Sequence, residues 1–77
     1  MNKRETVETR IDVIKDIINS VENLRDDYEI RADEYDCADF IPLVKRYQCR
    51  AVVCDDVIKM LQSVIDTLQC ELSLYPD

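Results

Sequence analysis

The stretch that decides the fold is residues 40–75, which read FIPLVKRYQCRAVVCDDVIKMLQSVIDTLQCELSLY. Taken in alternating steps of four and three, it gives eleven residues, of which none is charged and none is Gly or Pro. These residues are Phe40, Val44, Tyr47, Ala51, Cys54, Ile58, Leu61, Ile65, Leu68, Leu72 and Tyr75. Because side chains three and four residues apart share one face of a helix, the pattern predicts one long amphipathic helix.

The N-terminal half of the chain repeats this rhythm. Its seam residues are Val7, Ile11, Ile14, Ile18, Val21, Arg25, Tyr28, Ala32 and Tyr35. Ile17 and Leu24 widen the stripe to three apolar positions per heptad, which suits a helix that faces a bundle core better than a two-stranded seam. Asn2 is the expected N-cap, with Glu5 three residues later able to reach back to its amide. We expect a first helix over about residues 3–33.

The connection is expected within residues 34–40. It contains no Gly for a left-handed C-cap, so we expect a loose link of a few residues. Asp39 is the predicted N-cap of the second helix, which places Pro42 in the first turn, where its missing N–H costs nothing. The second helix should cover about residues 40–74 and end at Pro76. If the second helix is broken, we expect the break at the adjacent β-branched residues Val52 and Val53.

These elements predict an all-α fold: an antiparallel helical hairpin that forms a single domain over residues 1–77. The second helix also carries a second apolar series at the same spacing, Val53, Val57, Met60 and Val64. One partner helix cannot cover both series. A chain this small also buries too little surface to be more than marginal alone. We therefore expect a homo-oligomer, most simply two coiled-coil-like hairpins that dimerise into a four-helix bundle.

The charge is strongly acidic, with 17 Asp and Glu against 10 Lys and Arg, a net of -7. This disfavours nucleic acid and anionic membrane surfaces as partners. Residues 22–39, which we call the acidic bend, hold eight acidic and two basic residues. Seven of the eight are candidate contacts to a basic partner: Glu22, Asp26, Asp27, Glu29, Asp33, Glu34 and Asp36. The alternative interpretation, a solvated turn, stays open.

Arg25 interrupts the otherwise apolar seam of the first helix. In an antiparallel hairpin it should fall near Arg50, Ala51 and Cys54. Its guanidinium could extend to the rim, stack on a tyrosine (Tyr28 or Tyr47), or pair with Asp55. A single polar seam residue can also fix register and oligomer state.

No catalytic, cofactor or metal site is predicted. The chain has no His and no Gly, which removes the commonest general base, zinc sites with histidine ligands and glycine-rich phosphate loops. The four cysteines at 37, 49, 54 and 70 form no Cys-x-x-Cys pair. The N-terminal residues MNKRETVETR do not resemble a signal peptide, so we expect a cytoplasmic protein with free thiols. The even number of cysteines keeps disulfides open as an alternative.

The function expected from these features is that of a small acidic interaction module rather than an enzyme. It would act as an adaptor or inhibitor by binding another protein through Val53, Val57, Met60 and Val64 and through the acidic bend. Two alternatives remain. One is a nucleic-acid mimic that blocks a DNA-binding protein, and the other is a purely structural, self-assembling bundle.

Overall fold

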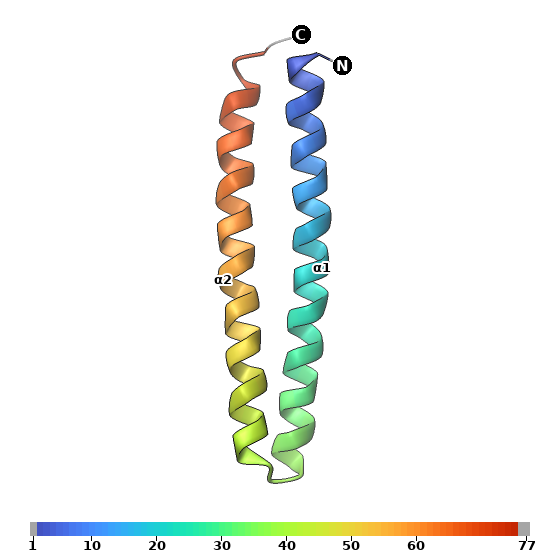
Figure 1. Cartoon of the computed structure of the whole chain (residues 1–77), viewed down its shortest axis with the longest axis vertical. Helices are drawn as coiled ribbons and strands as arrows, with labels where there is room; N and C mark the ends of the chain where they lie inside the picture. The colour runs from blue at the N-terminus through green and yellow to red at the C-terminus, as the bar shows by residue number, and fades with distance from the viewer. Residues whose placement is uncertain (1, 76–77) are drawn as a thin grey trace.

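The computed structural model describes residues 2–75 as two long helices folded back on each other (Figure 1). Helix α1 runs over Lys3–Cys37 and α2 over Ile41–Leu72, and the described residues contain no strand. The first turn of α1 lies beside the last turn of α2, and the connection lies at the other end. The hairpin is a thin rod with extents of 58 × 16 × 11 Å. The predicted all-α antiparallel hairpin is confirmed.

The free end of the hairpin holds a helix cap and a hydrogen bond between the two ends of the chain's described part. The Asn2 side-chain oxygen accepts a bond of 2.8 Å from the backbone N–H of Glu5, which is the expected N-cap. The guanidinium of Arg4 donates a bond of 2.8 Å to the carbonyl oxygen of Tyr75. Arg4 thereby ties the start of α1 to the residues that follow α2.

The connection is tight, not loose as expected, and α1 continues to Cys37, four residues beyond the expected end. Asp39 takes a left-handed conformation with φ of 64°. Its N–H bonds the carbonyl of Asp36 (3.1 Å), and the N–H of Phe40 bonds the carbonyl of Tyr35 (2.9 Å). These two hydrogen bonds form a Schellman motif, in which a residue in the left-handed conformation allows the last carbonyl groups of a helix to accept hydrogen bonds from the N–H groups that follow it. Asp is among the few residues other than Gly that tolerate this conformation.

The predicted N-cap of α2 was therefore wrong. Phe40 occupies that position instead, because Asp39 is used to end α1. The hydrocarbon side chain of Phe40 makes no cap hydrogen bond. Pro42 does lie in the first turn, as predicted. The helix passes through Val52 and Val53 without a break.

Helix α2 ends at Leu72, two residues before the expected end. Its last backbone hydrogen bonds join residues that are three apart instead of four. The Ser73 hydroxyl also donates a hydrogen bond of 2.6 Å to the carbonyl oxygen of Cys70. Pro76, the predicted stop, lies outside the described residues.

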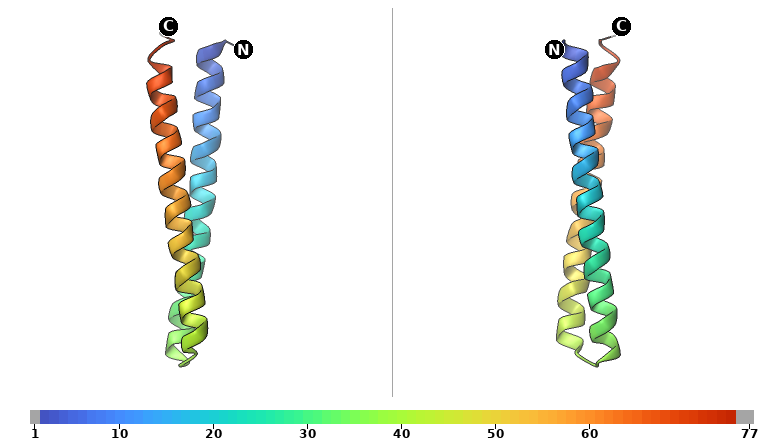
Figure 2. Two further views of the ribbon diagram at one scale, coloured as in Figure 1. Left: turned by 60° about the vertical axis from the view of Figure 1, so that its left-hand side comes forward. Right: turned by 90° about the vertical axis from the view of Figure 1, so that its right-hand side faces the viewer.

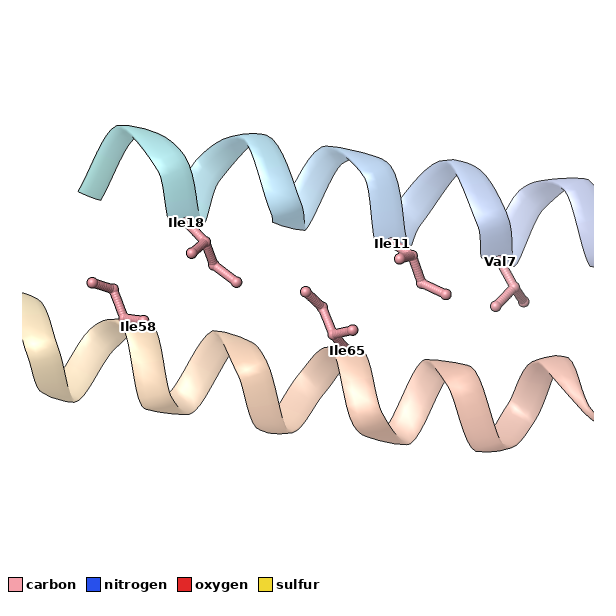
Figure 3. Close-up of a cluster of buried hydrophobic side chains, with 5 residues drawn as sticks. All are labelled: Val7, Ile11, Ile18, Ile58 and Ile65. Atoms are coloured by element: carbon pink, nitrogen blue, oxygen red, sulfur yellow. The ribbon is translucent and has the colours of Figure 1, made fainter. Parts of the chain in front are cut away.

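The core is the predicted seam except for Phe40, the first residue of the predicted series, which is 56% exposed because it precedes α2. Isoleucines dominate the core in the half nearest the free end, where Ile11 and Ile18 of α1 point towards Ile58 and Ile65 of α2 (Figure 3). Towards the bend the buried seam residues have smaller side chains than isoleucine: Ala32, Val44, Ala51 and Cys54. The two helices cross at a shallow angle along the rod (Figure 2).

The core is also thin. Among residues 2–75 nine are buried, all of them seam residues, and no large side chain in that range is completely shielded from water. A two-helix unit has no third element to cover the other sides of its helices, so the neighbouring apolar side chains stay in contact with water.

Candidate protein-binding surfaces

The two broad sides of the hairpin differ in chemistry, and one side is apolar across both helices. We call this side the apolar face. It consists of Val13, Ile17 and Leu24 of α1 with Val53, Val57, Met60 and Val64 of α2. Val57 is half-buried, and the other six side chains are between 42% and 62% exposed.

Three shallow grooves show that the face is continuous. The first runs between the helices and is lined by Leu24 of α1 and by Val53 and Val57 of α2. The second shares Leu24 and extends to Val13. The third shares Val13 and crosses to Val64 of α2. Each groove shares a residue with the next, so the six members of the face that line them form a single surface across both helices, and Met60, which lines none of the three, belongs to the face by its heptad position.

The heptad positions explain why these residues gather. Ile17 and Leu24 each come one position before a seam residue of α1. Val57 and Val64 do the same in α2. Two antiparallel helices are related by a two-fold axis perpendicular to their common plane, so equivalent positions lie on the same side of that plane. Residues four positions earlier share this side, which adds the remaining members of the face.

The opposite side is polar. A groove there is lined by Glu29 and Asp33 of α1 and by Gln48 and Asp55 of α2, with Val52 as an exposed apolar exception. The hairpin therefore has one side suited to solvent and one suited to burial.

Sequence reasoning identified only part of the apolar face. The series Val53, Val57, Met60 and Val64 was assigned to α2 alone, and Ile17 and Leu24 were treated as a separate widening of the first helix. Val13 was missed. The signal that could have joined them is their shared heptad position, combined with the antiparallel direction of the helices.

The acidic bend occupies the last four turns of α1 and the connection. Of its seven candidate residues, six are exposed and Glu22 is half-buried. They surround the helix on several sides and do not form one stripe. By the register of the Arg25–Asp55 contact, residues 22–39 face residues 41–58 of α2, which contribute three basic residues (Lys45, Arg46 and Arg50) and two acidic ones (Asp55 and Asp56). The net charge of this end is therefore -5, against -6 for residues 22–39 alone.

Aromatic residues fix the bend end. The rings of Tyr35 and Tyr47 stack at 5.5 Å, and Tyr35 also meets Phe40 edge to face at 6.2 Å. The guanidinium of Arg50 lies 5.1 Å from the Tyr47 ring centre and 5.8 Å from that of Tyr28. The cation that stacks on the tyrosines is thus Arg50 and not Arg25.

Arg25 instead pairs across the seam. Its Nη1 donates to the Asp55 carboxylate at 2.9 Å, and its Nη2 lies 3.3 Å from Asp26. The hydrogen bond to Asp55 raises the pKa of Arg25 above its usual value. Of the roles considered for Arg25, pairing with Asp55 is the one that the structure shows.

The cysteines do not form a site. Cys54 is buried in the seam, and Cys37, Cys49 and Cys70 are exposed with free thiols. Within residues 2–75, no three acidic or cysteine side chains lie close enough to hold a metal ion. Neither helix has, in that same range, the length and apolar content needed to cross a bilayer.

Comparison with known proteins gives no relative from which a role could be transferred. No protein-family model matches the chain, and no match is found among curated proteins or solved structures.

Proposed function

We propose that this chain is a small protein-binding module that works by burying its apolar face against helices of another polypeptide chain. The observation that carries the proposal is the continuity of that face across both helices, opposite a polar side. Exposed apolar surface that is gathered on one side and bounded by polar residues is typical of a protein-binding site.

The acidic bend supports a second, weaker role in the same module. Exposed charge near a binding face raises the rate of encounter with a partner of opposite charge more than it raises affinity. The bend would attract and orient a basic partner, and the apolar face would supply the binding free energy for the chain that covers it. Such a module acts as an adaptor or an inhibitor, depending on whether the bound partner is recruited or blocked.

The arrangement of charge favours this role over nucleic-acid mimicry. A mimic needs carboxylates in a regular array, whereas here they surround the end of α1 and have Lys45, Arg46 and Arg50 beside them. The chain also exposes an apolar face whose members are all uncharged, which a mimic does not need.

The test compares two substitutions of the same kind on neighbouring residues. A tagged chain is co-expressed with an untagged copy in host cells, and the retained polypeptides are identified. Val53→Asp places a charge on the apolar face, and Val52→Asp places the same charge on the polar side at nearly equal exposure, 60% against 58%. We expect Val53→Asp to lose the retained chain and Val52→Asp to keep it. Retention that is equal in both variants, or absent in the wild type, would refute the proposal.

A second arm varies salt. Binding through buried apolar surface should persist when salt is added, because salt screens charge contacts and not apolar burial. Binding that collapses in salt while Val53→Asp has no effect would favour mimicry.

A further inference from the structure

The hairpin exposes more surface than a compact chain of its mass. Its accessible surface is 5689 Å² for 9.1 kDa. The usual scaling of surface with mass gives about 4,900 Å² for a folded monomer of this size. The excess of about 800 Å² is close to the area that each partner loses in a standard two-protein interface.

The apolar face lies at the middle of the rod. The contacts Arg25–Asp55 and Arg4–Tyr75 show that facing residues of the two helices have numbers that add to about 80. By this register, the α1 part of the face, residues 13–24, lies opposite residues 56–67, which nearly coincide with the α2 part at 53–64. Both parts therefore lie at the same level, around residue 20 of α1, the midpoint of Lys3–Cys37. An isologous two-fold interface places the same patch of both copies against each other, and because this patch is centred the two rods can then lie alongside each other over most of their length.

Each helix has more apolar surface than the hairpin seam covers. Each has one apolar side packed in the hairpin seam and a second, adjoining side on the apolar face. Helices with two adjacent apolar sides are those of a four-helix bundle, in which every helix packs against two neighbours. Two hairpins are the smallest number that provides the four helices.

Charge does not oppose self-pairing here. The members of the apolar face are all uncharged, and the acidic bend lies towards one end of the rod, mainly beyond Leu24. The face itself therefore contributes no charge to the interface, and Asp16, which lines one of its grooves beside Val13 and Ile17, is the acidic residue that a covering chain must leave hydrated.

From these observations we infer that the chain covering the apolar face is a second copy of this one, so that two hairpins pack face to face as a four-helix bundle. This inference rests on the proposed function, because it names the partner of the same face. In the dimer the acidic bends stay outside the buried interface, where they remain free to bind a basic partner.

The experiment is the molecular mass of the purified full chain in solution, measured across a wide range of protein concentration. We expect twice the chain mass of 9.1 kDa for the wild type, with a thermal midpoint that rises with concentration. Met60→Asp, at the most exposed member of the face (62%), and Val53→Asp should each give the monomer mass. Val52→Asp should keep the dimer mass.

Circular dichroism of each variant covers the case in which a monomer does not fold. Loss of helix in Met60→Asp and Val53→Asp, with Val52→Asp a folded dimer, would support the inference, because the face is then needed for folding. A wild type that stays at the monomer mass, a higher oligomer, or a dimer unaffected by both substitutions would overturn it.

The two failures can be told apart. If the wild type is a monomer but Val53→Asp still loses a different retained protein in co-expression, the protein-binding function stands and the second copy is refuted. If the wild type is a monomer and retains nothing, both proposals are refuted.

Discussion

The guanidinium of Arg25 and the carboxylate of Asp55 meet at 2.9 Å across the seam, on the polar side of the hairpin. The two side chains are unequally exposed, 27% for Arg25 and 44% for Asp55. Replacing one partner should therefore not have the same effect as replacing the other. An uncompensated charge costs more when it is less hydrated.

We expect Asp55→Asn to lower the thermal midpoint, because the partly buried guanidinium then loses its closest acceptor. Arg25→Leu should raise it, because the seam gains an apolar residue and Asp55 can be hydrated. Thermal unfolding followed by circular dichroism measures both. Asp56→Asn, an exposed neighbour with the same change in charge, is the control and should leave the midpoint nearly unchanged. An equal response to Asp55→Asn and Asp56→Asn would mean that the ion pair contributes nothing measurable.

Asp39 provides a second prediction, because it holds a left-handed backbone conformation without being Gly. Asp39→Gly should raise the free energy of unfolding by about 0.5–1 kcal/mol, since Gly adopts this conformation without a Cβ penalty. Asp39→Val should lower it by about 1–2 kcal/mol. Urea denaturation measures both changes.

The matched control is Asp36→Gly, three residues earlier and inside α1. There the backbone is helical, so Gly should lower the free energy of unfolding by about 0.5–1 kcal/mol. If both Gly substitutions lower the stability equally, the left-handed turn at Asp39 is wrong.

The seam was predictable from sequence because it depends on one simple property, a repeat of apolar residues at helical spacing. Every seam residue from Val7 to Tyr35 in α1 is buried or half-buried, Arg25 included. The tight connection was not predictable in the same way. It needs a left-handed residue, and Asp39 fills that position without the Gly that usually signals it.

The apolar face shows a different limit. Its α2 residues were found because they repeat within one helix. Val13, Ile17 and Leu24 joined them only when the direction and register of the two helices were known. A surface that is built by two elements depends on their relative placement, which neither element's pattern contains alone.

The thin core gives a third prediction. Ile58 of α2 is buried in the seam, whereas Ile30 of α1 lies outside the seam and is 56% exposed. Ile58→Val should lower the free energy of unfolding by about 1 kcal/mol, because one buried methylene group is removed and its space is only partly refilled. Ile30→Val should change it by less than about 0.5 kcal/mol. Equal effects in urea denaturation would contradict the assignment of the seam as the core.

The last prediction concerns the acidic bend. The final turn of α1 holds Glu34 and Asp36 and no basic residue, although the partial negative charge at a helix C-terminus repels carboxylates. Glu34→Gln should therefore raise the free energy of unfolding, by about 0.3–1 kcal/mol at low ionic strength. Glu5→Gln, in the first turn of the same helix, should have the opposite sign, because carboxylates are favourable there.

Urea denaturation at low and high salt tests this pair. Both differences should shrink when salt is added, since the interaction with the helix dipole is screened. The same sign in both variants would refute the dipole argument. If the signs differ as expected, the acidic bend keeps its charge at a cost in stability, which is consistent with a role in binding and is not needed for the fold.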